Sequence, residues 1–175
     1  MVERWRRATA AAQADDRGLA LLYAVAQRRL ARAGFRHYEI ANWAKPGKRS
    51  LHNLTYWRSG EWLGVGAGAH SHLDGIRSHR PPSLVAYVSE IERGASRAVD
   101  ARSDAASEAA MLGLRLDTGI DLARFAARSG RDARERIASA LRSVDGRGLV
   151  RWDGDRARLT PRGRILANEV FVHLL

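Results

Sequence analysis

Apolar residues recur with helical spacing over residues 14–33, between polar and basic positions. The apolar face of this segment consists of Leu19, Leu22, Ala26 and Leu30. This pattern predicts an amphipathic helix, which Gly34 would end. The next ten residues, FRHYEIANWA, are rich in aromatic and branched side chains and predict a strand over residues 35–44. A helix, a glycine turn and a strand form half of an αβ repeat, so the pattern favours an α/β fold here.

The middle of the chain continues with a second strand and a helix. EWLGVGAGAHSHL, residues 61–73, predicts a strand that runs into a glycine-rich bend. Ser83 is a typical N-cap for a short helix whose apolar face is Leu84, Tyr87, Val88 and Ile91. The following stretch, RGASRAVDARSD at residues 93–104, is small, polar and charged, which is typical of a domain boundary. The expected domains are residues 1–100 and 101–175.

The C-terminal part has a different pattern, with three helices predicted in SDAASEAAMLGLRL, LARFAARSG and DARERIASALRSVDGRG. Asp121 is placed to cap the second of them. Two short strands around Asp153-Gly154 predict a hairpin, and Thr160-Pro161 predicts the start of a last helix. Three helices, a hairpin and a helix in this order are typical of a winged-helix domain.

Composition limits the possible chemistry of the chain. The sequence contains no cysteine, which excludes disulfides, zinc–thiolate sites, thiol nucleophiles and cysteine-held iron–sulfur clusters within it. No apolar run reaches the roughly 20 residues that span a bilayer, and the N-terminus lacks the apolar core of a secretory signal. We therefore expect a cytoplasmic protein.

The formal charge of +11 has two interpretations. A strongly basic chain is typical of proteins that bind nucleic acid, acidic ligands or an anionic surface. The other interpretation is compositional. Of the 30 basic residues only Lys45 and Lys48 are lysines, and a chain rich in arginine and alanine is also what a GC-biased genome encodes.

Two short motifs are candidate ligand sites. GVGAGA resembles a phosphate loop, but Gly64, Gly66 and Gly68 have a G-x-G-x-G spacing, which does not match a dinucleotide fingerprint. These glycines instead favour a close backbone approach or space for a large ligand. His70 and His72 alternate on the predicted strand, so both could bind one metal ion, but a surface or hydrogen-bonded role is the more common one for such a pair.

RSLHNLTYWRSGEW, residues 49–62, combines a histidine with three aromatic side chains. A neutral imidazole is a good axial ligand for haem iron, which makes His52 a candidate. Aromatic walls for a flat macrocycle could come from Trp43, Tyr56, Trp57 and Trp62. Arg49 and Arg58 could pair with the propionates. The alternative is an aromatic hinge that packs a loop onto the sheet.

The winged-helix pattern raises a separate hypothesis of nucleic-acid binding. The third predicted helix and the hairpin carry candidate phosphate and groove contacts, namely Arg131, Arg134, Arg136, Arg142, Arg147, Arg151, Arg156 and Arg158. The alternative, which we favour, is a solvated arginine face on a domain that packs against its neighbour.

Several stretches in one order resemble a known family. They are YEIANWAKPG (38–47), HNLTYW (52–57), EWLGVGAGAHS (61–71), and LRLDTGIDLARF followed by RLTPRGRILANEV. Together they are similar to the C-terminal half of the oxygen-independent coproporphyrinogen III oxidase-like radical SAM proteins, and in particular to the HemW-like haem chaperone branch. The resemblance implies an α/β fragment of a radical SAM partial (β/α) barrel, followed by a small helical winged-helix-like C-terminal domain.

The resemblance also implies site residues and cofactors. His52, Asn53, Tyr56 and Trp57 correspond to a motif associated with haem, with His52 as the iron ligand, and Ala44 matches a position near S-adenosyl-L-methionine. The usual serine of YEIS is Ala41 here. Full-length members hold a [4Fe–4S] cluster on a CxxxCxxC motif that this sequence lacks, so this chain is not expected to hold the cluster, bind S-adenosyl-L-methionine or catalyse a reaction alone. It resembles a truncated member.

The resulting expectation is haem binding and haem trafficking. The implied partners are haem and acceptor haemoproteins, with delivery at a membrane surface, and nucleic acid is not an expected partner. Coproporphyrinogen III oxidase-type activity and a winged-helix nucleic-acid-binding module are the two alternatives.

Overall fold

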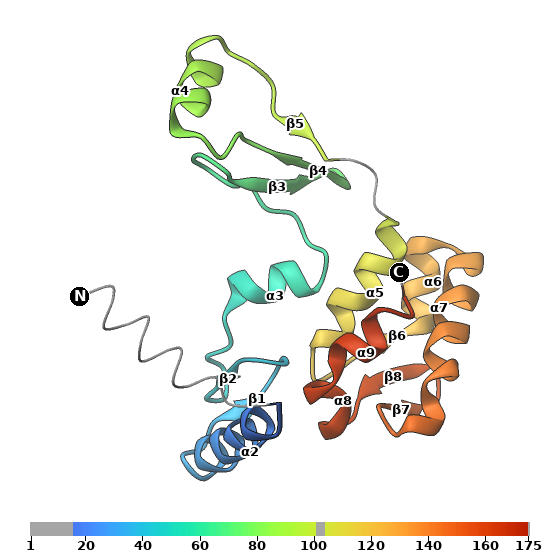
Figure 1. Ribbon diagram of the computed structural model, residues 1–175. Helices are drawn as coiled ribbons and strands as arrows, with labels where there is room; N and C mark the ends of the chain where they lie inside the picture. The colour runs from blue at the N-terminus through green and yellow to red at the C-terminus, as the bar shows by residue number, and fades with distance from the viewer. Residues whose placement is uncertain (1–15, 101–103, 175) are drawn as a thin grey trace. The chain divides into compact units, whose positions relative to one another are not determined.

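The computed structural model describes residues 16–100 and 104–174 (Figure 1). The chain forms two compact units, residues 1–49 and 50–175. The domain boundary expected at residues 100 and 101 stays a prediction, because residues 101–103 lie outside the described ranges. The first two residues of the helix expected over residues 14–33 also lie outside them.

The first unit contains α2 (Asp16–Arg32), β1 (Arg36–His37) and β2 (Trp43–Ala44). The prediction of one strand over residues 35–44 is wrong, because the chain reverses and β1 pairs antiparallel with β2. Glu39 explains the reversal. Its buried carboxylate accepts hydrogen bonds from the backbone N–H of Ala41 and from Asn42 Nδ2, both at 2.7 Å. A local side-chain bond of this kind competes with extended structure.

The second unit begins with α3 (Leu51–Trp57), and the interpretation of this segment as a loop is wrong. Three antiparallel strands follow: β3 (His70–Leu73), β4 (Ile76–His79) and β5 (Ala98–Val99), in the order β3-β4-β5. The strand expected from residue 61 begins only at His70, because Gly66 and Gly68 adopt positive φ angles that interrupt extended backbone. Within residues 61–69, Trp62 alone forms a bridge, with His72.

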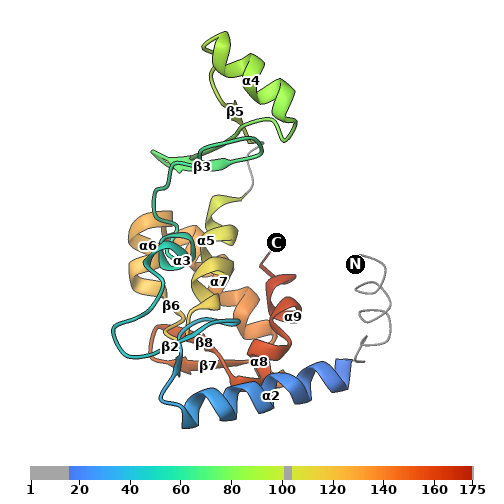
Figure 2. The same ribbon diagram turned by 90° about the vertical axis from the view of Figure 1, so that its left-hand side faces the viewer.

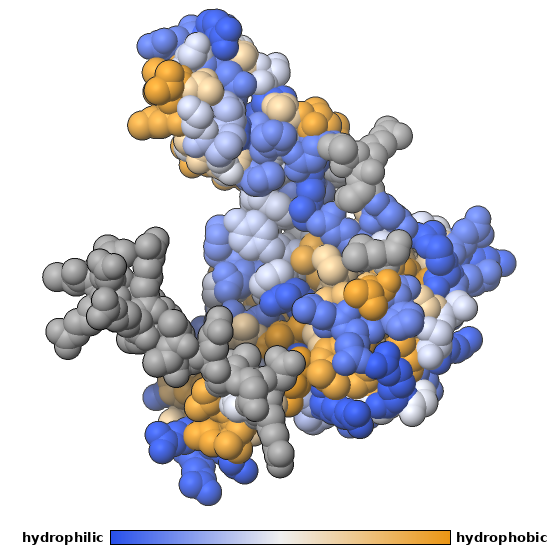
Figure 3. Space-filling model, in the orientation of Figure 1, coloured by the Kyte–Doolittle hydropathy of each residue, from blue (hydrophilic) through white to orange (hydrophobic). Residues whose placement is uncertain are grey.

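The helix predicted after Ser83 is confirmed as α4 (Leu84–Glu92), and the Ser83 hydroxyl accepts a hydrogen bond from the Ala86 N–H. None of its residues is buried, and Leu84 and Val85 are strongly exposed. Figure 3 shows hydrophobic residues at the surface in the region of α4.

The C-terminal part contains the three predicted helices, α5 (Ala105–Arg115), α6 (Leu122–Ser129) and α7 (Arg131–Ser143). A 3₁₀ turn, Asp145–Arg147, leads to β7 (Val150–Asp153) and β8 (Arg156–Leu159), and α8 (Pro161–Ile165) and α9 (Ala167–Phe171) follow. The hairpin turn is Gly154-Asp155, one residue later than predicted. The sequence did not predict β6 (Ile120–Asp121), which pairs with β8 and completes a sheet of order β6-β8-β7.

One hydrophobic core holds these C-terminal elements together. Its large, fully buried apolar side chains are Leu114, Leu122, Ile137, Leu141, Val144, Leu149 and Val170. α6 and α7 lie side by side in both ribbon views (Figures 1 and 2). The predicted caps Asp121 and Thr160 are confirmed, since each accepts a backbone hydrogen bond at the start of its helix.

The N-cap of α5 gives a pH-dependent prediction. Asp104 accepts hydrogen bonds from the Ser107 hydroxyl at 2.9 Å and from the Ala106 N–H at 3.1 Å, and the Ser107 bond is the main reason that the pKa of the Asp104 carboxyl lies below its ordinary value. Such a carboxylate stabilises the fold above its unfolded pKa, and this contribution is lost as the pH falls through the folded pKa. We therefore expect the free energy of unfolding of Asp104→Asn to fall less steeply than that of wild type below about pH 4. Urea unfolding at a series of pH values measures this, and identical slopes would contradict it.

Candidate functional site

The HNLTYW sequence forms α3. The helix begins after Ser50, whose side-chain oxygen accepts a hydrogen bond from the Asn53 N–H at 3.2 Å. Leu54 is buried, and α3 packs against α5. A seven-residue helix is too short to be stable alone in water, so this packing is what fixes the side chains of the motif.

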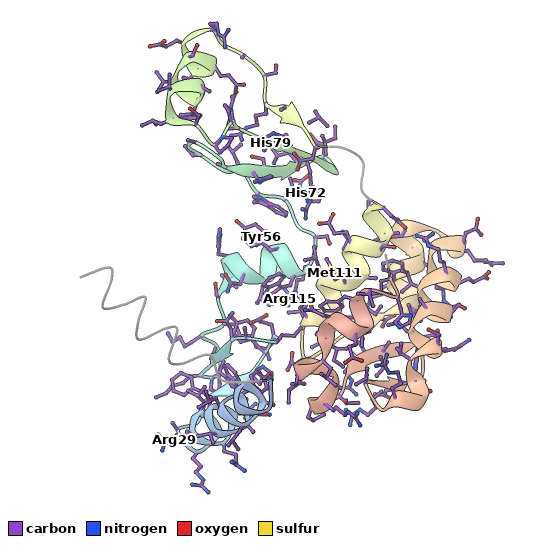
Figure 4. All side chains as sticks on the ribbon, viewed as in Figure 1. Arg29, Tyr56, His72, His79, Met111 and Arg115 are labelled. Carbon is purple, nitrogen blue, oxygen red and sulfur yellow. The ribbon has the colours of Figure 1, made fainter. Side chains whose placement is uncertain are left out.

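One face of α3 carries His52 and Tyr56. They are four residues apart, and the His52 ring meets the Tyr56 ring in a T-shaped contact with centroids 4.8 Å apart. Tyr56 in turn contacts Trp62 at 4.5 Å, and Trp62 contacts His72 at 5.1 Å. Figure 4 shows Tyr56 on α3 and His72 on the neighbouring sheet. The rings of His52, Tyr56, Trp62 and His72 therefore form a continuous series of contacts.

The other two residues of the motif lie on an adjacent face. Asn53 and Trp57 are also four residues apart, and the helical rotation separates them from His52 and Tyr56 by about 100°. The guanidinium carbon of Arg115 on α5 lies 4.3 Å from the Trp57 ring centroid, a cation–π contact. Within the described ranges, the buried Nε1 of Trp57 has no hydrogen-bond partner. The structure therefore divides the four predicted haem residues into two pairs.

His52 differs from most histidines of the chain. It is exposed, and no hydrogen bond or ion pair involves its ring nitrogens among residues 16–100 and 104–174. His37 and His72 each bond a backbone carbonyl, at 3.0 Å and 2.8 Å. His173, also exposed, shares the unbonded state of His52 within the described part of the chain. An imidazole nitrogen without a hydrogen-bond partner is available to bind a metal.

The remaining predicted residues of this site belong to the first unit. Ala44 is a buried residue of β2, where it pairs with Arg36. Trp43 stacks on His37 with ring centroids 4.5 Å apart, and the Arg49 guanidinium lies 5.9 Å from the Tyr38 ring. These side chains thus have partners within their own unit.

The second unit also contains a cleft of about 1120 Å³ that the sequence did not indicate. Trp57, Arg77, Glu108, Leu112 and Arg128 are among its lining residues, and Arg77 forms an ion pair with Glu108 at 2.7 Å. No other residue of HNLTYW lines the cleft. His52 and Tyr56 do not line the cleft, whereas Trp57, Arg58 and His72 do.

The sheet brings together a second group of side chains, His70, His79 and Asp100. Asp100 accepts hydrogen bonds from both imidazoles, and the bond from His79 is the main reason that the pKa of its carboxyl lies below the ordinary value. The alternation of the predicted strand suggested His70 and His72 as a metal-binding pair, whereas the strand register places His70 opposite His79. The sequence feature that could have predicted this pairing is Asp74-Gly75, because a two-residue hairpin turn at these positions sets the register of β3 and β4.

The arginines of the C-terminal part have partners inside the domain. Arg134 pairs with Asp155 at 2.9 Å, and Arg142 lies 5.6 Å from the Trp152 ring centroid. Six of the eight arginines considered for nucleic-acid contacts have an acidic or aromatic partner of this kind, namely Arg134, Arg136, Arg142, Arg147, Arg156 and Arg158. This arrangement favours a solvated arginine face over a phosphate-binding surface.

Among the described helices, none has the length and apolar character needed to cross a membrane.

Structural comparison defines the class of fold. The chain is similar to the structure of coproporphyrinogen III oxidase (HemN) from Escherichia coli, described as a radical SAM enzyme, with a TM-score of 0.65 and 17% sequence identity. The match covers 88% of this chain and 39% of that one. At this identity the likeness concerns the fold alone, a mixed α/β part of the HemN radical SAM fold.

Sequence comparison defines the family. The family model described as the HemN C-terminal domain matches residues 101–166. The heme chaperone HemW of Mycobacterium tuberculosis is 38% identical over all of this chain and 44% of its own length, and that of Bacillus subtilis is 33% identical over 86% of this chain and 41% of its own length. The chain therefore spans less than half the length of these curated relatives. It belongs to the HemW/HemN-like family.

Radical SAM members of this fold imply a [4Fe–4S] cluster, which thiolates normally hold. The 175 residues contain no cysteine, so the residues present do not fit that cluster.

Proposed function

We propose that this chain binds haem in the manner of a haem chaperone, with His52 of α3 as the residue that would bind the iron. The observation that carries the proposal is the exposed His52 imidazole, whose ring nitrogens have no hydrogen-bond partner among the described residues. Two relatives similar in sequence, 38% and 33% identical to this chain, carry the name heme chaperone HemW, which supports the same ligand.

The residues around His52 support this role. The T-shaped contact between the Tyr56 and His52 rings would restrict rotation of the imidazole, and a restricted ring loses less entropy when it binds a ligand. Leu51, the preceding residue, is 78% exposed and offers apolar surface on the adjacent face of α3. The exposed Arg58, after the C-terminal end of α3, could pair with a propionate.

Haem supplies an iron that accepts a nitrogen lone pair, and its flat macrocycle is largely apolar. On this chain, His52 would donate the lone pair from an unbonded ring nitrogen. Tyr56 would hold the imidazole, and Trp62 would support Tyr56 through its own ring contact. Asn53 and Trp57, on the adjacent face, would contact one edge of the ligand or stabilise α3. His52 remains accessible, which suits a protein that binds haem and then transfers it to acceptor haemoproteins.

A haem titration tests the proposal. We expect the purified chain to shift the Soret band of added hemin with a saturable midpoint, and His52→Ala to weaken that binding by at least about tenfold, because loss of a metal ligand costs no less than loss of a residue that supports one. The matched control is His173→Ala, which removes the other exposed, unbonded imidazole. A Soret titration that is the same for His52→Ala and wild type would falsify the proposal.

Tyr56 provides a second arm. Tyr56→Phe retains the aromatic ring and should bind hemin like wild type. Tyr56→Ala removes the ring that contacts His52, so the His52 imidazole would rotate more freely and hemin binding should weaken.

The finer features of the fold are also proposed. Residues 101–175 would form a winged-helix-like domain, supported by the order α5, β6, α6, α7, β7, β8 and by the family model that begins at residue 101. Ala44, buried on β2, would lie near S-adenosyl-L-methionine in a full-length member. Delivery of haem at a membrane surface belongs to the same proposal. Oxidase-type activity is not favoured, because two relatives that are 38% and 33% identical to this chain carry the name heme chaperone HemW.

A further inference from the structure

Three strands of one sheet bring two imidazoles and a carboxylate to the same place. His70 on β3 lies directly opposite His79 on β4, and His79 is opposite Ala98 on β5. Asp100 follows β5 directly, and its N–H donates to the Arg77 carbonyl at 2.9 Å. The sheet therefore determines the spacing of all three side chains. Figure 4 labels His79 on this sheet.

The three side chains are already near the geometry of a metal site. One possible ligand atom from each lies within 4.8 Å of the others, and His70 Nδ1 is 3.4 Å from Asp100 Oδ2. Ligand atoms on a tetrahedral zinc ion are about 3.3 Å apart, as follows from bonds of about 2.0–2.1 Å. Rotations of the side chains alone can supply the remaining movement, since the His70 side chain is 63% exposed and that of His79 38%.

We propose that His70, His79 and Asp100 bind a divalent transition-metal ion of the zinc class. Two imidazole nitrogens and one carboxylate oxygen are ligands that zinc accepts, and three protein ligands leave a fourth position for water or another ligand. The exposed side of His70 is where that position would open to solvent. The site lies on the sheet and uses none of the residues of α3, so it is distinct from the proposed haem ligand.

Backbone hydrogen bonds hold the two strands that carry His70 and His79 together. Arg80, which follows His79, donates its N–H to the Ala69 carbonyl at 3.0 Å, and Ala69 precedes His70. Gly68 donates to the Pro81 carbonyl at 2.9 Å. These bonds extend the pairing of β3 and β4 beyond the two histidines. Arg77 lies on the same strand as His79, and its positive charge would repel a bound cation. Its ion pair with Glu108 reduces this repulsion.

A zinc titration tests the site. The full chain without an affinity tag is titrated with ZnCl₂ by calorimetry, and with Co²⁺ as a spectroscopic probe of tetrahedral geometry. We expect one Zn²⁺ per chain and a visible d–d absorption with Co²⁺. His70→Ala, His79→Gln and Asp100→Asn should each weaken Zn²⁺ binding by at least about tenfold, because loss of a ligand costs no less than loss of its supporting residue. His70→Ala is the variant least expected to disturb the fold, since it removes the most exposed of the three side chains.

Two controls separate this site from other histidines. His173→Ala and His52→Ala should both leave the Zn²⁺ affinity unchanged, because neither residue belongs to the sheet. Far-UV circular dichroism verifies the fold of each variant. The proposal is overturned if wild type binds no Zn²⁺, if a folded His70→Ala binds it as wild type does, or if His52→Ala loses it. Loss of hemin binding in His52→Ala with Zn²⁺ binding intact is the expected combination and separates the two proposals.

Discussion

Gly163→Ala is expected to lower the free energy of unfolding by about 2–4 kcal/mol, because a methyl group there meets backbone with no room to move. A Cβ at this position would lie 1.9 Å from the Leu149 carbonyl oxygen. That oxygen is fixed by the Thr160 N–H, which donates to it at 2.9 Å, and the Gly163 N–H donates to Thr160 Oγ1 at the same distance. Relief of the clash therefore requires α8 to separate from the strand pair.

Gly146→Ala is the matched control for this variant. A Cβ at Gly146 meets nothing within 4 Å, and Gly146 is not among the glycines with positive φ. Both substitutions reduce the entropy of the unfolded chain equally, so their difference isolates the contact. Urea unfolding followed by far-UV circular dichroism measures the two values. Equal stability of both variants would show that α8 does not approach Leu149 closely.

Leu54→Ala is expected to cost about 2–4 kcal/mol and to release α3. Leu54 is 6% exposed and is the buried residue of that helix. Removal of its side chain leaves a cavity where α3 packs against α5, and a seven-residue helix has little intrinsic stability to compensate. We therefore also expect weaker hemin binding, because the His52 and Tyr56 pair exists only while α3 is formed.

Leu51→Ala makes the same chemical change on the same helix at a position that is 78% exposed. Its unfolding free energy should remain within about 0.5 kcal/mol of wild type. Thermal and urea unfolding measure both variants. If Leu54→Ala and Leu51→Ala were equally stable, the packing of α3 would not depend on Leu54.

The sequence predicted those features that depend on neighbouring residues. The caps Ser83, Asp121 and Thr160 are confirmed, because a side-chain oxygen near the first N–H groups of a helix acts locally. The interpretation that glycines in GVGAGA permit close backbone approach is confirmed for Gly64, where a Cβ would lie 2.1 Å from the His70 carbonyl oxygen.

Features that depend on distant residues or on a single competing bond were missed. The strand at residues 35–44 reverses because of one carboxylate, that of Glu39, which no periodicity reveals. The two-residue β6 exists only because β8 pairs with it. The group of His70, His79 and Asp100 requires the register of three strands, and Asp100 is 30 residues from His70 in the sequence.

The family was predicted correctly because its motifs are short, continuous stretches of sequence. The distribution of the HNLTYW residues over two faces of a helix was not predicted. Four motif residues within six positions suggest one pocket, but the period of 3.6 residues separates His52 and Tyr56 from Asn53 and Trp57 once the segment becomes helical.

The contacts of α3 with two arginines have a consequence for how its orientation responds to conditions. Arg115 of α5 lies over Trp57, and Arg128 of α6 donates to the carbonyl oxygens of Arg58 and Ser59 at 3.3 and 3.5 Å. Both contacts involve a guanidinium charge, and dissolved ions screen such contacts where they are exposed. The orientation of α3, and with it the direction of the His52 imidazole, should thus respond to ionic strength.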